Sequence, residues 1–200
     1  MPRRRLRWIG PALALAAMAT RSPATVVAPL TLEEIVRAAD RILIATVAET
    51  RCAPSLRGRS IDTIVILEDV RSLKGSPLPT SAYAFRQRGG RIGEREVLFP
   101  GSPELRAGGR YLLFLHEDGR ILSPIVGLRL GCFRIAEGRV CDDAGNPVVG
   151  IRAGRPVVRA DPDPAEAPIS SDAFIAHIEA IIASQALDAR RPESGGEAGR

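Results

Sequence analysis

Four arginines lie within one short, glycine-rich segment and form a candidate binding site: Arg86, Arg88, Arg91 and Arg95. A guanidinium group presents its N–H donors in a rigid planar fork that matches the two oxygens of a carboxylate. Loops carried on a β scaffold are common recognition sites. We therefore expect this segment, helped by residues 100–110, to bind an anion or an acidic partner. The competing interpretation is an ordinary solvated loop.

The three cysteines, Cys52, Cys132 and Cys141, are a second candidate for chemistry. In an exported protein, a pair of cysteines is expected to oxidise. A tight turn at 137–138 would make Cys132 and Cys141 diagonal neighbours on one face of a hairpin, at the limit of the separation that a disulfide spans. Three alternatives remain: a Cys132–Cys141 bridge, a bridge that uses Cys52, or no bridge.

No combination of residues in the sequence indicates catalysis. The two histidines, His116 and His177, are not adjacent in sequence to a cysteine that they could activate. The CxxC, HExxH and HxH spacings of metal sites are absent, as is the G-x-S-x-G of serine hydrolases. We expect no catalytic residue, no metal ion and no cofactor.

The charge of the chain is unevenly distributed. The formal net charge is +5, but residues 1–28 contain five arginines and no acid. The remaining residues hold 23 bases and 23 acids. Nucleic-acid binding requires a surplus of cations, and single strands also require aromatic residues on which bases stack. We therefore expect no nucleic-acid partner.

Residues 1–28 have the pattern of a secretory signal peptide. Basic residues 3–7 precede an apolar run at 8–19, which is too short to span a bilayer. Small residues then permit cleavage after Ala19 or after Ala28. The sequence thus predicts a protein that is periplasmic or secreted, with no stable membrane insertion after processing.

The central part of the chain, 29–151, is predicted to be a β-barrel domain. Thr31 and Glu34 have the spacing of a capping box, which predicts a short helix at 32–39. Short β-prone segments then recur with turn residues between them, which favours a five- to six-stranded antiparallel barrel. The expected strands are 42–48, 61–70, 81–87, 97–99, 111–115 and 121–126, followed by a hairpin at 132–141.

The C-terminal part is predicted to contain one helix. Residues 152–169 are rich in proline and indicate a linker. Residues 170–189 follow as a helix docked on the barrel through one apolar stripe, comprising Phe174, Ile178, Ile181 and Ile182. The last residues, 190–200, have no apolar anchor and are expected to be disordered.

Four segments together resemble a family of exported bacterial proteins of unknown function: LEEIVRAADRILIATV (32–47), IVILEDVRSLKG (64–75), GGRYLLFL (108–115) and VGLRLGCFRI (126–135). The same run is similar to the netrin-like module of tissue inhibitors of metalloproteinases, which implies an OB-like barrel. Those inhibitors begin with Cys-x-Cys, whose terminal amine chelates the zinc of the protease. Neither predicted mature start, Thr20 or Pro29, is a cysteine, so the resemblance does not extend to that chelation.

These observations favour an exported, non-catalytic binding module with an unidentified ligand. The expected partner is a secreted protease or a cell-surface component. The alternative is an envelope or secreted enzyme whose active site has no recognisable motif.

Overall fold

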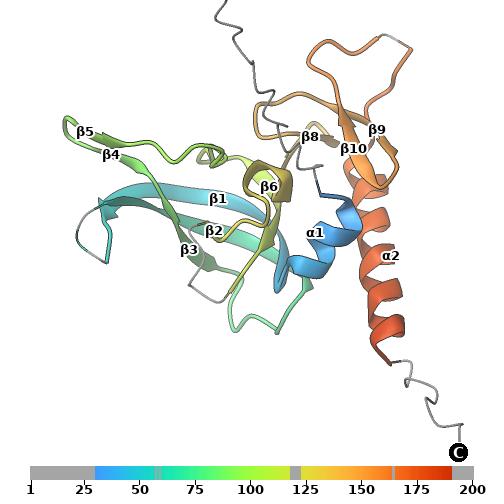
Figure 1. Ribbon diagram of the computed structural model, residues 1–200, viewed down its shortest axis with the longest axis horizontal. Coiled ribbons are helices and arrows are strands. Elements are labelled where there is room, and N and C mark those ends of the chain that lie inside the picture. Colours follow the sequence, from blue (N-terminus) through green and yellow to red (C-terminus); the bar gives the residue numbers. More distant parts are fainter. Residues whose placement is uncertain (1–29, 57, 59, 118–122, 164, 191–200) are drawn as a thin grey trace, which may run out of the picture.

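The computed structural model describes residues 30–56, 58, 60–117, 123–163 and 165–190. It confirms that the chain is mainly β. The largest unit is a six-stranded antiparallel sheet with the strand order β3-β2-β1-β6-β7-β8 (Figure 1). Its strands are β1 (Arg41–Pro54), β2 (Ile61–Lys74), β3 (Tyr83–Arg88), β6 (Arg110–Leu115), β7 (Cys132–Ala136) and β8 (Arg139–Cys141).

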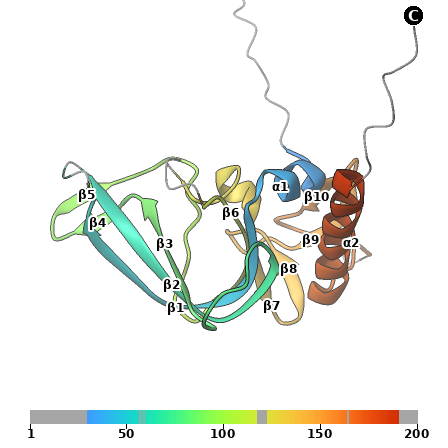
Figure 2. The ribbon, with the colours of Figure 1, turned by 90° about the horizontal axis from the view of Figure 1, so that it is seen from below.

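Two small sheets and three helical segments complete the described part. One small sheet pairs β4 (Gly90–Ile92) with β5 (Arg95–Val97), and the other pairs β9 (Val148–Arg152) with β10 (Arg155–Val158). The helices are α1 (Leu32–Ala38), α2 (Ser171–Arg190) and a 3-10 turn, η1 (Leu128–Gly131). The β4–β5 hairpin lies at the end of the molecule farthest from α2 (Figure 1, Figure 2).

The closed barrel expected from the strand spacing is not formed by the described residues. β3 and β8 are the two ends of the strand order, and no pairing in the described part joins them. The exposed side of β8 is taken instead by the segment before α2, where the Val140 N–H donates to the Ile169 carbonyl (3.3 Å). This segment occupies the edge that closure would require.

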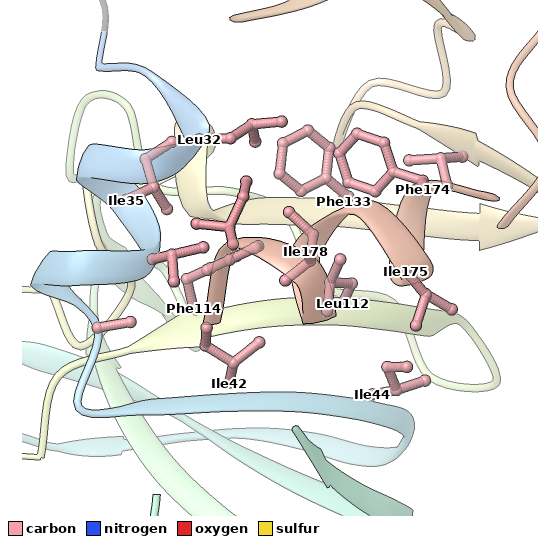
Figure 3. Close-up of a cluster of buried hydrophobic side chains, with 14 of the residues drawn as sticks. Leu32, Ile35, Ile42, Ile44, Leu112, Phe114, Phe133, Phe174, Ile175 and Ile178 are labelled. Carbon is pink, nitrogen blue, oxygen red and sulfur yellow. The ribbon is translucent and has the colours of Figure 1, made fainter. Parts of the chain in front are cut away.

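The main sheet separates two apolar cores because successive strand residues point to opposite faces. Ile42 and Ile44 lie in the core covered by α1 and α2, whereas Leu43 and Ala45 lie in the core on the other face. In the helix-covered core, the rings of Phe133 and Phe174 lie 5.0 Å apart between their centroids. Figure 3 shows this core, with the aromatic rings and the isoleucines of α2 against the strands.

Local signals explain how α1 is placed. The Thr31 hydroxyl accepts the Glu34 N–H (3.2 Å), and the Glu34 carboxylate accepts the Thr31 N–H (2.7 Å), which is the capping box that the sequence predicts. Leu32, Ile35 and Val36 are buried. The helix therefore begins at a fixed point and turns its apolar face onto the sheet.

α2 packs along the same core. Its fully buried residues include Phe174 and Ile178, while Ile181 is 8% exposed. The buried face of the helix differs slightly from the predicted apolar stripe: it includes Ile175, and Ile182 is only partly buried. The helix is held by apolar contact and by polar links, among them the Gln185 amide, which donates to the Glu33 carbonyl (2.8 Å), and the pair between Glu179 and Arg71.

The segment 152–169, expected to be an irregular linker, contains a strand. β10 pairs with β9 across a tight turn, in which Ala153 and Gly154 both have positive φ angles of 48° and 72°. Pro156 is accommodated because it lies in a two-stranded sheet, where a missing ladder donor is tolerated. The Gly154 carbonyl accepts the Leu32 N–H (2.7 Å), so the hairpin abuts the start of α1.

The predicted signal peptide, 1–28, lies outside the described residues. Of the predicted disordered tail, 190–200, only Arg190 is described, and it is the last residue of α2. Residues 121 and 122 of the expected strand 121–126 also lie outside the described residues. In the part of that segment that is described, Ile125 forms an isolated bridge with Leu115.

Candidate functional site

The strand register brings three arginines onto one open face of the main sheet. Arg51 of β1 is opposite Ile64 of β2, and Ile64 is opposite Arg86 of β3, so these residues form one row. Arg88 follows two positions along β3 and therefore points to the same face. Arg51 and Arg86 are exposed, and Arg88 is half-buried. We call Arg51, Arg86 and Arg88 the β3 surface.

Carboxylates also lie on this face: the exposed Glu49 is opposite Ile66 in the row next to that of Arg51, and Asp62 lies beside Arg88. Asp62 is opposite Arg88 in the β2–β3 ladder and is 7% exposed. Its Oδ2 lies 3.9 Å from an Arg86 guanidinium nitrogen, and its Oδ1 has no hydrogen-bond partner among the described residues. Asp62 offsets part of the charge, but a separation at this limit leaves the Arg86 fork available for another carboxylate.

Arg91 and Arg95 lie in a separate sheet. The sequence indicates a flexible loop at 88–94, but Arg88 ends β3 and residues 90–94 belong to the β4–β5 hairpin. Arg91 is opposite Glu96 and bonds to it at 2.8 Å, which raises the pKa of Arg91. Since both side chains are exposed, this pair contributes little stability, and Glu96 already occupies the Arg91 fork.

The hairpin is docked on the face opposite the β3 surface. The Thr63 hydroxyl donates to the Gly89 carbonyl (2.8 Å), and the Arg91 N–H points at the Cys52 sulfur (3.4 Å). A Cβ at Gly90 would lie 2.7 Å from that sulfur, so glycine permits this close approach. The four arginines that are neighbours in sequence are thus divided between two sides of the sheet.

Residues 100–110 do not extend the β3 surface. The Pro103 carbonyl accepts the Gln87 amide (3.2 Å), and Leu105 is buried in the same core as Phe85. Gln87 and Phe85 alternate with the arginines of β3 and point to its buried face. The loop therefore covers the back of β3, while Arg51, far away in sequence, replaces it as the third contributor to the surface.

The cysteines are free in the structure, so the Cys132–Cys141 bridge is not formed. The predicted hairpin register is correct, since Cys141 is opposite Arg134. Diagonal neighbours in such a ladder are roughly 7–8 Å apart, which exceeds the usual span of a disulfide. Burial raises the pKa of both thiols, most strongly that of Cys132, which is fully buried. The thiolate form needed for nucleophilic attack is disfavoured at both.

The two histidines lie in different surroundings. His116 follows β6, and its Nδ1 is 3.9 Å from an Asp40 oxygen at the molecular surface. The Nε2 of His177 is buried without a hydrogen-bond partner among the described residues. In the described part of the chain, no three His, Cys, Asp or Glu side chains are grouped closely enough to hold a metal ion.

One apolar cavity was not anticipated from the sequence. It has a volume of about 350 Å³ and lies beside α1, η1 and β7, with Arg129 and Asp143 among its lining residues. The Asp143 carboxylate is 7% exposed and pairs with Arg129 at 3.2 Å. Burial raises the pKa of Asp143, and Arg129 opposes that effect. This carboxylate already has a cation, so the cavity presents an ion pair rather than a poised acid or base.

Comparison of the chain with protein-family models, with curated proteins and with solved structures gives no match. No helix of the described residues is long and apolar enough to cross a membrane. The functional argument therefore depends on the geometry of the β3 surface.

Proposed function

We propose that this chain is an exported, non-catalytic binding module whose β3 surface binds carboxylate groups of a secreted protease or a cell-surface component. The observation that carries the proposal is the placement of Arg51, Arg86 and Arg88 on one open face. The buried Asp62 and the exposed Glu49 offset part of their charge. A rigid sheet holds the backbones of the three arginines in fixed relative positions, which lowers the entropy that binding must offset.

The chemistry of the surface favours protein carboxylates. A planar guanidinium can form two parallel bonds to one carboxylate, and such charge-assisted bonds are stronger than neutral ones. The half-buried Ile64 lies between Arg51 and Arg86, so the surface also offers some apolar contact. We expect moderate affinity that weakens as salt screens the charges.

The resemblance to the netrin-like module enters the proposal through strand order. β1 lies centrally between β2 and β6, and in the described residues the sheet does not close between β3 and β8. OB folds are themselves partly open barrels, so we propose an OB-like relationship that does not require closure. The β3 surface would then correspond to a recognition surface of such a fold.

Export is supported by the basic, apolar and small-residue order of 1–28. We expect the mature chain to begin at Thr20 or near Pro29 and to be recovered outside the cytoplasm. Intact-mass measurement of the recovered protein checks this, because either start removes Trp8, the single tryptophan of the sequence. Recovery of a full-length chain that retains Trp8 would refute the expectation.

The binding proposal is tested by capture of partners from the native culture supernatant or envelope. The double variant Arg86→Ser/Arg88→Ser is expected to capture the main partner about 5- to 30-fold less well, which corresponds to a loss of one or two kcal/mol. A matched control, Arg37→Ser/Arg110→Ser, removes the same charge from exposed positions outside the β3 surface. Equal capture by both folded variants would refute the role of the β3 surface.

A further inference from the structure

β3 has one open edge in the described structure. It pairs with β2 over six residues, from Leu67 opposite Tyr83 to Asp62 opposite Arg88. No other described strand pairs with β3, and none of its backbone groups bonds to a described loop. An open strand edge presents a row of backbone donors and acceptors that another extended chain can join.

The hydrogen-bond ladder identifies which backbone groups point outward. The Gly89 N–H donates to the Ile61 carbonyl (2.9 Å), so residues 61 and 89 are a hydrogen-bonded pair. Such pairs alternate with non-bonded pairs along an antiparallel ladder. Residues 85 and 87 therefore bond to β2, whereas the N–H and C=O groups of Ala84, Arg86 and Arg88 point away from it.

The same three residues carry the accessible side chains of β3. Ala84 and Arg86 are exposed and Arg88 is half-buried, while Phe85 and Gln87 are buried. The exposure of Ala84, whose side chain is small, shows that the strand itself is accessible at this position. An added strand would thus meet both the backbone edge and two guanidinium groups.

We propose that the partner binds by strand addition: an extended, acidic segment pairs with the outer edge of β3, and its carboxylates contact Arg86 and Arg88. The inference rests on the proposed function and specifies the form of its partner. Backbone bonds would supply affinity, and the alternating acidic side chains would supply specificity. A second copy of β3 is a poor occupant, because pairing would bring arginines of the two copies together.

A synthetic probe tests the inference directly. The peptide acetyl-TEVETEV-amide is expected to bind the mature protein, and its glutamine counterpart acetyl-TQVQTQV-amide to bind at least about tenfold more weakly. Binding is measured by calorimetry at low and physiological salt. In an extended peptide, alternate N–H groups point to the same edge. Two further peptides are therefore N-methylated, one on the glutamates and the other on the residues between them, so that each peptide loses the N–H donors of one edge. Strand addition requires one of them to lose binding and the other to retain it.

A substitution at Ala84 removes one backbone N–H donor from the outer edge of β3 without changing the charge of the protein. Ala84→Pro deletes an N–H that points away from β2, which an edge strand tolerates, whereas Ala84→Ser keeps it. We expect Ala84→Pro to bind the acidic peptide about tenfold more weakly than Ala84→Ser. If Ala84→Pro does not fold, as judged by circular dichroism, the two N-methylated peptides decide the question alone.

The outcomes separate this inference from the proposed function. Absence of peptide binding, or equal binding of both N-methylated peptides, overturns strand addition. If partner capture nevertheless depends on Arg86 and Arg88, the proposed charged binding surface is still supported. Capture of anionic phospholipid vesicles in place of the peptide also overturns strand addition and would identify a lipid surface as the ligand.

Discussion

Replacing Ile178 with aspartate is expected to lower the free energy of unfolding by about 4 kcal/mol or more. Ile178 is fully buried in the helix-covered core, among residues of α1, β6 and β7 (Figure 3). The substitution removes apolar contact and places a carboxyl group where no cation or donor is provided. Thermal and denaturant unfolding of the mature protein measure the change.

The adjacent residue provides a matched control. Glu179 pairs with Arg71 at 2.6 Å, but both side chains are about half exposed. A surface pair of this kind contributes roughly 0–1 kcal/mol, so Glu179→Ala is expected to leave stability nearly unchanged. If Ile178→Asp were as stable as Glu179→Ala, the apolar stripe of α2 would be free for a partner and would not support the sheet.

Much of the fold could be predicted because its signals are local. The Thr31 and Glu34 pair defines the start of α1, and the 137–138 turn gives the register of the β7–β8 hairpin. In both cases a few neighbouring residues determine the backbone. The C-terminal helix was predictable for the same reason, since its apolar residues recur at helical spacing.

Some of the predictions that failed depend on pairing between distant segments, and others concern local hairpins. Residues 51–54 looked like a loop because they are polar and end in Pro54, yet they continue β1 by pairing with β2. Polar residues are compatible with a strand there because this part of the sheet is open to solvent. The β4–β5 and β9–β10 hairpins were missed because their glycines and prolines indicate turns without indicating what lies on either side.

The candidate site shows the same limit. Arg91 and Arg95 are close to Arg86 in sequence but belong to a different sheet. Arg51 joins Arg86 only through the β1–β2 and β2–β3 registers. Composition pointed to arginine, and only the pairing of three strands shows which arginines share one face.

A second large effect is expected when Glu117 is removed from its ion pair with Arg41, the buried cation where β1 begins. Its side chain is 5% exposed and pairs with Glu117. It also donates to the Ser76 carbonyl (2.8 Å) and lies 5.4 Å from the centre of the Tyr83 ring. Asp40 accepts the Glu117 N–H (2.9 Å), which fixes the backbone that presents the carboxylate. The end of β2 and the end of β6 are thus tied to the start of β1.

The two partners of this ion pair are expected to respond unequally to substitution. Glu117→Ala removes the carboxylate that compensates a buried cation, and should cost about 2 kcal/mol. This is below the roughly 3–5 kcal/mol of a fully buried pair, because Glu117 is 39% exposed and water can approach the cation from its position. Arg41→Met fills similar space with an apolar chain and leaves Glu117 in contact with solvent, so it should change stability by about 1 kcal/mol or less.

The double variant Arg41→Met/Glu117→Ala separates this explanation from simple loss of contacts. If the cost of Glu117→Ala comes from an uncompensated charge, that cost disappears once the charge is absent, and the double variant should match Arg41→Met. Urea unfolding of the four proteins gives the coupling free energy as a double-mutant cycle. Additive losses would instead show that Glu117 stabilises the corner independently of Arg41, and the ion pair would not be what holds these three strand ends together.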